Sequence, residues 1–133
     1  MSQNTESTPA PHILFFRNTS VENYRRLSPE ERQRLVARWT TWYEDLVAQG
    51  KAVGGRPLEP YARLVSGPGG ERVTDGPYAE GKEEIGGYVA LAVESFDEAT
   101  DIARSHPALE HGIIIEVRRF AEVCHLGVCS PKK

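Results

Sequence analysis

The stretch GGYVALAVESFDEATDIARSHPALEHGIIIEVR, residues 86–118, contains a complete strand–helix–strand pattern. Its first part, 86–93, is almost continuously apolar, which predicts a buried strand. Ser95 and Glu98 have the spacing of a helix capping box. Four apolar residues at helical spacing then predict a short helix: Phe96, Ala99, Ile102 and Ala103. Because another apolar run occupies 112–118, the segment predicts one β-α-β unit.

A second unit of the same kind begins earlier in the chain. His12–Arg17 is a short apolar run that ends in charge, as a buried strand does. Ser28, Pro29 and Glu31 form the start signal of a long helix, and Gly50 is its natural stop. One wide apolar stripe runs along this predicted helix: Leu35, Val36, Trp39, Trp42, Tyr43, Leu46 and Val47.

The segment between the two patterns predicts a strand and a hairpin. We expect a loop at Gly54-Gly55, a strand over Leu58–Val65 and a turn at 67–70. Glu71–Thr74 is a short returning strand, and Asp75-Gly76-Pro77 is a second turn signal. The order is strand, helix, strand, hairpin, strand, helix, strand. This order predicts an α+β fold of the ferredoxin-like, split-βαβ type.

In such a fold both helices cover one face of the sheet, and the other face needs a cover of its own. The strand Tyr88–Val93 is apolar in both of its alternating sets of residues, and so is Ile113–Ile115. A strand that is apolar on both sides is covered on both sides. Since the sequence shows only two good helices, we expect a second copy to supply the cover, as a homodimer.

Length and composition indicate one globular domain. The chain has 133 residues and a mass of 14.8 kDa, with 39% hydrophobic and 26% charged residues. A formal charge of -3 argues against nucleic acid as a partner, since phosphate-binding surfaces are basic. We expect a flexible arm at 1–11, a folded domain at 12–120 and a tail at 121–133.

Apolar runs such as Ile13–Phe16 are too short to span a membrane. Met1–Pro11 lacks the apolar core of a signal peptide. The two cysteines cannot supply a disulfide framework. These features predict a cytoplasmic protein without a membrane partner.

The segment Val73–Tyr88, VTDGPYAEGKEEIGGY, closely resembles the signature of the YCII-related, DGPF-domain family, with Tyr78 in place of the motif's phenylalanine. The resemblance continues through FDEA at 96–99 and GIIIEVRRF at 112–120. It implies a ferredoxin-like domain that dimerises as an α/β barrel. Relatives in the wider superfamily have a proposed His–Asp pair, and one is a dehydrochlorinase of chlorinated hydroquinones. The first helix of this chain carries no histidine, so a helix-borne pair of that kind is missing.

Two residues are candidates for acid–base chemistry. Asp75 can fix a turn by accepting backbone N–H bonds, and that role alone explains its presence. It can instead present a carboxylate to a pocket as a general base. His106, before Pro107, either stabilises the carbonyl groups at a helix C-terminus or shuttles protons as a partner of Asp75. His12 and His111 are interpreted as edge or loop residues.

The long predicted helix carries three aromatic residues that either pack in the core or line an apolar pocket for a small ring-bearing ligand: Trp39, Trp42 and Tyr43. Arg17, at the end of the first strand, and Tyr88 are candidate polar contacts in such a pocket. Arg118 and Arg119 have the chemistry to anchor an acid, although charges at strand ends are commonly solvated.

Cys124, His125 and Cys129 are too few for a structural zinc site, which needs four ligands. We expect free thiols there, with no metal and no cofactor. Two functions fit these features. The first is a small-molecule binding or accessory protein with a cleft between helix and sheet, which the missing helix histidine favours. The alternative is a cofactor-free acid–base enzyme, lyase or hydrolase-like, that acts on a small aromatic substrate through Asp75 and His106.

Overall fold

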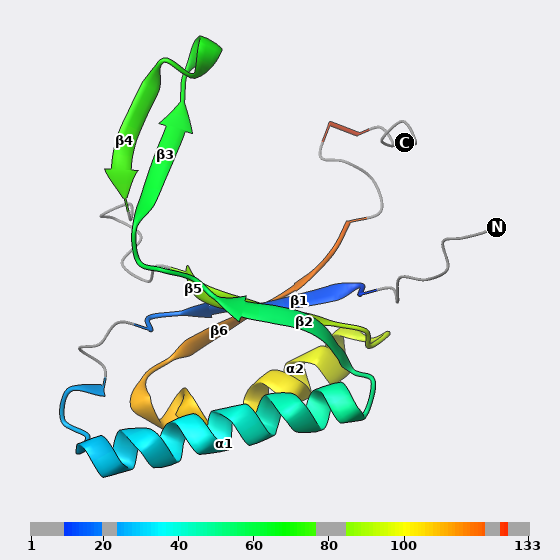
Figure 1. The fold of residues 1–133 in the computed structure, drawn as a ribbon. Coiled ribbons are helices and arrows are strands. Elements are labelled where there is room, and N and C mark those ends of the chain that lie inside the picture. Colours follow the sequence, from blue (N-terminus) through cyan, green and yellow to red (C-terminus); the bar gives the residue numbers. More distant parts are fainter. Residues whose placement is uncertain (1–9, 20–23, 77–84, 122–125, 128–133) are drawn as a thin grey trace.

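The computed structural model describes residues 10–19, 24–76, 85–121 and 126–127 (Figure 1). These residues contain the following strands and α-helices in chain order: β1 (His12–Arg17), α1 (Pro29–Ala48), β2 (Ala52–Pro57), β3 (Ala62–Ser66), β4 (Arg72–Gly76), β5 (Ile85–Leu91), α2 (Phe96–Arg104) and β6 (Ile114–Arg119). Two short 3-10 helices accompany them, η2 (Pro68–Gly70) and η3 (Pro107–His111). The expected order of strands and helices is confirmed.

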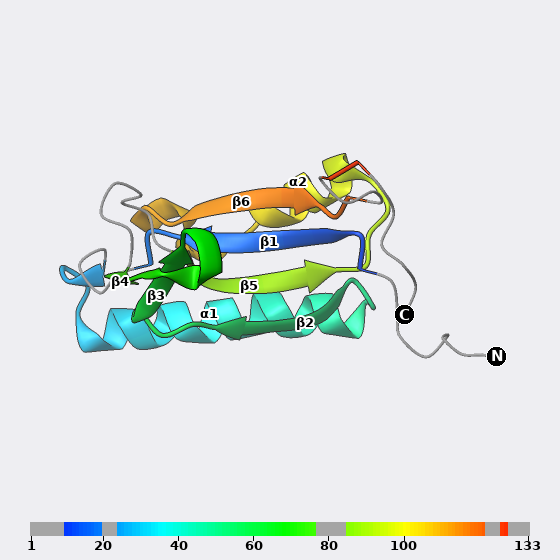
Figure 2. The same cartoon turned by 90° about the horizontal axis from the view of Figure 1, so that it is seen from above.

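Four strands form one antiparallel sheet in the order β2-β5-β1-β6. Each β-α-β crossover passes over one neighbouring strand, which is the arrangement of a ferredoxin-like fold. Both helices lie on the same face of this sheet (Figures 1 and 2). The α+β prediction of two helices on one side of an antiparallel sheet is therefore confirmed.

The core lies between the sheet and the helices. Alternate residues of β1 face the helices and are buried: His12, Leu14 and Phe16. Val89 and Leu91 of β5 share that face. Leu35 and Leu46 of α1 belong to the same buried core cluster. The helix side of the sheet is therefore a close-packed apolar layer.

The strands β3 and β4 form a separate two-stranded hairpin. It rises from the sheet on the side opposite the helices (Figures 1 and 2). Its register pairs Arg63 with Asp75 and Val65 with Val73, and η2 forms the turn between the strands. The predicted turn at 67–70 is thus confirmed.

Of the two predicted capping boxes, one forms completely and the other forms in part. At α1, the Ser28 side chain accepts from the backbone N–H of Glu31 at 3.1 Å, and the Glu31 carboxylate accepts from the Ser28 N–H at 2.8 Å. This is the full capping box. At α2, the Ser95 hydroxyl accepts from the Glu98 N–H at 2.9 Å, but the Glu98 carboxylate pairs with Lys51 at 3.3 Å. Only half of the second capping box therefore forms.

The predicted strand over Leu58–Val65 begins too early but overlaps β3, Ala62–Ser66, whereas the predicted loop at Gly54-Gly55 is wrong. The strand that pairs with β5 is β2, Ala52–Pro57, so Gly54-Gly55 lie in a strand and not in a loop. The reason is the close approach of the two backbones, since a Cβ on Gly55 would lie 2.7 Å from the carbonyl oxygen of Tyr88. Glycine is the residue that permits such contact at a sheet edge.

The interpretation of His12 as an edge or loop residue is also wrong. His12 is fully buried in β1, a central strand of the sheet. Its Nδ1 lies 2.9 Å from the carbonyl oxygen of Val93, and its Nε2 lies 3.4 Å from Nη1 of Arg119. Because arginine only donates, Nε2 accepts and Nδ1–H donates to Val93.

Neither described helix is both long enough and apolar enough to cross a bilayer.

Candidate functional site

The sheet face opposite the helices is left open by the described elements of the chain. The strand alternation and the register place these side chains on it: Ile13, Phe15 and Arg17 of β1, Tyr88 and Ala90 of β5, and Ile114, Glu116 and Arg118 of β6. Apolar and aromatic groups therefore occupy the middle of this face, and a charged cluster lies at one side of it. We call this surface the open face.

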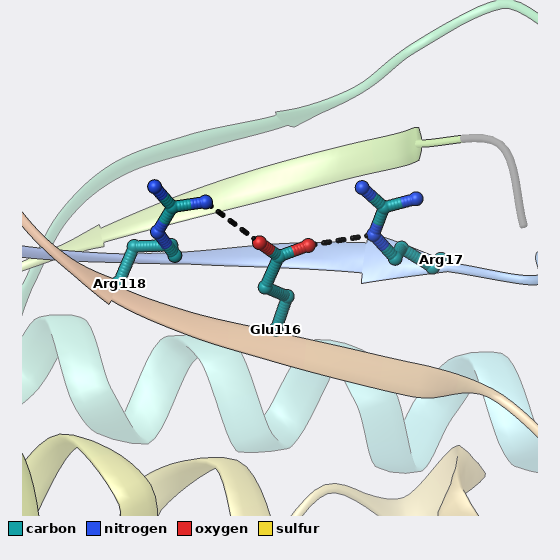
Figure 3. A network of polar contacts seen from close by, with 3 residues as sticks. All are labelled: Arg17, Glu116 and Arg118. Carbon is teal, nitrogen blue, oxygen red and sulfur yellow. Dashed lines mark hydrogen bonds and ion pairs between the residues drawn. The ribbon is translucent and has the colours of Figure 1, made fainter. Parts of the chain in front are cut away.

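The charged cluster is a three-residue network on β1 and β6 (Figure 3). Nε of Arg17 donates to Oε1 of Glu116 at 2.7 Å, and Nη1 of Arg118 donates to Oε2 at 2.9 Å. Figure 3 shows all three side chains on the side of the sheet away from the helices. The two guanidinium groups thus share one carboxylate, each through a different oxygen of Glu116.

Strand register explains why these three groups meet. Arg17 pairs with Ile114 across the β1–β6 ladder, so Glu116 is the diagonal neighbour of Arg17 on the same face. Arg118 follows Glu116 by two positions along β6, which returns it to that face. The network is thus a direct product of the antiparallel register.

Electrostatics keep Glu116 ionised. The hydrogen bond from Arg17, with a second from Arg118, holds the pKa of the Glu116 carboxyl below its ordinary value. The Glu116 side chain is only 27% exposed, so water screens these bonds incompletely. Glu116 is therefore a fixed acceptor that orients two guanidinium groups, and it is poorly suited to act as a general acid at neutral pH.

His106 lies on the opposite side of the sheet, inside an aromatic cluster. Its ring centroid is 4.4 Å from that of Trp39, 4.6 Å from that of Trp42 and 5.3 Å from that of Phe16. Its Nδ1 accepts from the backbone N–H of Ala108 at 3.0 Å, so it caps the start of η3. The neutral ring consequently carries its hydrogen on Nε2, which has no hydrogen-bond partner among the described residues.

Burial decides the charge of His106. The residue is 4% exposed, and desolvation lowers the pKa of its imidazole to about 4. At neutral pH it is an uncharged ring among aromatic neighbours.

The structure does not bring Asp75 and His106 together. Asp75 lies in β4 of the projecting hairpin, above the sheet, while His106 lies below the sheet beside α1. The Asp75 side chain is 92% exposed and its Oδ1 lies 3.9 Å from Nε of Arg63. It lines an open hollow of about 520 Å³ with Tyr61, Ala62, Arg63 and Gly76.

The candidate ligand contacts fall into two separate groups. Arg17 and Tyr88 lie on the open face, whereas three aromatic side chains of α1 pack against the core from the helix side: Trp39, Trp42 and Tyr43. Nε1 of Trp42 donates to Oγ of Ser105 at 2.9 Å. Trp42 also lines a groove of about 390 Å³ together with Ala37, Arg38, Thr41, Ser105 and Pro107.

Sequence reasoning missed Phe15 and Glu116 as members of the open face. The available signal was Glu116 itself, a carboxylate inside an otherwise apolar strand and two positions before Arg118. Its significance depends on the β1–β6 register, which is a non-local feature.

The described residues contain no group of three or more metal-ligating side chains close enough to hold an ion. Cys124, His125 and Cys129 lie outside the described residues, and so does the part of the signature segment at 77–84.

The sequence and the fold of the chain resemble those of known proteins. The family model of the YCII-related domain matches residues 15–121. One similar solved structure is 5-chloro-2-hydroxyhydroquinone dehydrochlorinase from Burkholderia phenoliruptrix AC1100, in complex with 2,5-dihydroxybenzoquinone. It is 18% identical, with 86% of this chain and 97% of that chain covered and a TM-score of 0.47. These values are too low to carry an activity over to this chain. No curated protein sequence matches it.

Proposed function

Since the chain belongs to the YCII-related domain family, we propose that it binds a small molecule on the open face of its sheet and works as a homodimer. The observation that carries this proposal is the Arg17–Glu116–Arg118 network beside Phe15 and Tyr88. The network lies on a sheet face whose other side chains are apolar or aromatic in the centre, with Arg56 of β2 opposite Tyr88 at the edge. It suits a site that combines an apolar body with a few fixed polar groups.

The chemistry of the network favours a small aromatic anion. Glu116 accepts a hydrogen bond from Arg17 and another from Arg118, which orients both guanidinium groups on the open face. Guanidinium groups recognise carboxylate and phenolate oxygens through charge-assisted hydrogen bonds. Phe15 and Tyr88 are paired across β1 and β5 and offer flat apolar surface for a ring.

The homodimer is part of the same proposal. A ligand site buries most of its ligand, which a sheet face open to water cannot do alone. Two sheets that pack face to face are about 10 Å apart. A second copy on the open face would therefore form the dimeric α/β barrel and enclose a ring-sized ligand between the sheets. Ile114, which is 43% exposed on this face, would be buried by that contact.

The alternative is a cofactor-free acid–base enzyme of the lyase or hydrolase type. The observation in its favour is the hollow at the base of the hairpin, where Asp75 lies with Arg63 and Tyr61. A carboxylate and a phenol can exchange protons with a substrate, and a guanidinium can stabilise negative charge beside them. The Asp75 side chain, however, is 92% exposed, so it lies in water and not in an enclosed site.

The test is calorimetric titration of the purified protein with benzoate, 4-hydroxybenzoate and phenol, with uncharged benzamide for comparison. We expect the anions to bind more tightly than benzamide. Arg118→Gln should weaken the binding of the anions at least tenfold, whereas Arg104→Gln, an exposed arginine on α2, should not change it. Equal affinity of the two variants for the anions would overturn the open-face site. Turnover of a bound phenol that is lost in Asp75→Asn would favour the enzyme.

A further inference from the structure

The β3–β4 hairpin is the described part of the chain that has the least contact with the rest. Its two strands pack mainly on each other and form a sheet of their own. It rises on the same side as the open face, as both cartoon views show (Figures 1 and 2). A two-stranded hairpin without further packing is at best marginally stable in water. Among the described residues, no other element packs extensively on the hairpin, so we look for the surface that stabilises it.

The hairpin presents apolar side chains to such a surface. Val65 and Val73 face each other across the two strands and are 65% and 57% exposed. Tyr61, just before β3, is exposed as well. Paired β-branched residues stabilise a sheet when they are covered and promote association when they are not.

The net charge of the hairpin indicates which class of partner it can bind. The hairpin residues 62–76 contain Arg63, Arg72, Glu71 and Asp75, which sum to zero. Nucleic acid and anionic membranes select surfaces with a basic excess. A neutral arm with an apolar pair fits a protein surface instead.

We propose that the β3–β4 hairpin is a dimerisation arm, which passes the edge of a second copy's sheet and packs Val65 and Val73 against that copy. Five-residue strands that rise about 3.3 Å per residue span about 17 Å, whereas facing sheets lie about 10 Å apart. The arm is therefore long enough to reach past the sheet of a copy seated on the open face. In a dimer with two-fold symmetry, each arm contacts the other subunit. The exposed valines of the arm and the open face are then both covered in one closed assembly.

This inference rests on the proposed homodimer and adds a second contact to it. The experiment compares three variants with the wild type by sedimentation velocity over a range of protein concentrations. Val65→Asp/Val73→Asp changes the arm, Ile114→Lys changes the open face, and Val36→Asp changes an equally exposed valine on α1. We expect the arm and open-face variants each to raise the dimer dissociation constant at least tenfold, and Val36→Asp to leave it unchanged.

Other outcomes contradict either the arm alone or the arm together with the homodimer. If Ile114→Lys dissociates the dimer while the arm variant stays as tight as wild type, the arm is wrong and the homodimer stands. A wild type that is monomeric at every concentration overturns both. A second measurement uses wild-type protein alone: hydrogen exchange of the β3 and β4 amides should accelerate on dilution to monomer. Unchanged exchange would overturn the arm even if the double variant folded poorly.

Discussion

The imidazole of His106 stands edge-on against the indole of Trp39, with ring centroids 4.4 Å apart and an interplanar angle of 88°. This contact places a titratable group in an apolar environment between helix and sheet. Its neutral form packs there as an aromatic side chain, and its charged form would lose hydration without gaining a partner. The contact therefore explains the low pKa of His106 and leads to a prediction about stability.

The folded protein should lose stability between pH 6.5 and pH 4. The His106 pKa is about 4 in the folded chain and near 6.5 when unfolded, so the unfolded state takes up this proton first. The contribution is complete above pH 6.5 and falls by up to about 3 kcal/mol as pH approaches 4. Urea unfolding at pH 7.5, 5.5 and 4.5 measures it.

Two variants isolate this effect. His106→Asn keeps an acceptor for the Ala108 N–H, and His106→Phe keeps a ring. Both should flatten the pH dependence of the unfolding free energy relative to wild type, whatever their stability at pH 7.5. A slope unchanged in both would show that His106 is not the group responsible.

The Arg17–Glu116 pair should show a measurable coupling. A double-mutant cycle with Arg17→Gln and Glu116→Gln should give a coupling free energy of about 1 kcal/mol at low salt, since the pair is close and half-buried. The coupling should weaken in 1 M NaCl because salt screens it. The Arg63–Asp75 pair, at 3.9 Å and almost fully exposed, serves as the control and should give a value near zero. Equal couplings would contradict the network.

Ser28→Ala should lower the unfolding free energy by about 1 kcal/mol, because the Glu31 N–H loses its acceptor at the start of α1. Ser28→Asp retains an acceptor at the same place and should stay within a few tenths of a kcal/mol of wild type. Chemical denaturation at pH 7.5 separates the two variants. A Ser28→Asp variant as unstable as Ser28→Ala would mean that the cap is not the cause.

Local features were the predictable ones. The run His12–Arg17 and the Ser28 capping box depend on neighbouring residues alone, and both are found as predicted. The sequence predicts a loop where β2 lies, because Gly54-Gly55 carry no side-chain signal and their strand conformation comes from pairing with β5. The burial of His12 likewise follows from its place in the centre of the sheet.

The residues of the candidate site also divide into those that the sequence can indicate locally and those that depend on the strand register. Arg17 could be proposed from its place at a strand end, and Tyr88 from its place in an apolar strand. Glu116 could not, because its contact with Arg17 exists only in the β1–β6 register. The arm was visible in the sequence as a hairpin, but its direction relative to the open face is a property of the three-dimensional fold.

Two adjacent glycines of β2 supply the sharpest test of the corrected strand. A Cβ on Gly55 would lie 2.7 Å from the carbonyl oxygen of Tyr88 and 2.9 Å from a methyl group of Val89, so Gly55→Ala forces β2 away from β5. Overpacking of this kind costs about 1–3 kcal/mol. Gly54→Ala meets no atom within 4 Å and should change the unfolding free energy far less. Thermal and urea unfolding of both variants give the comparison. Similar stability of the two would mean that Gly55 does not pair with β5 as described, and that the edge of the sheet lies elsewhere.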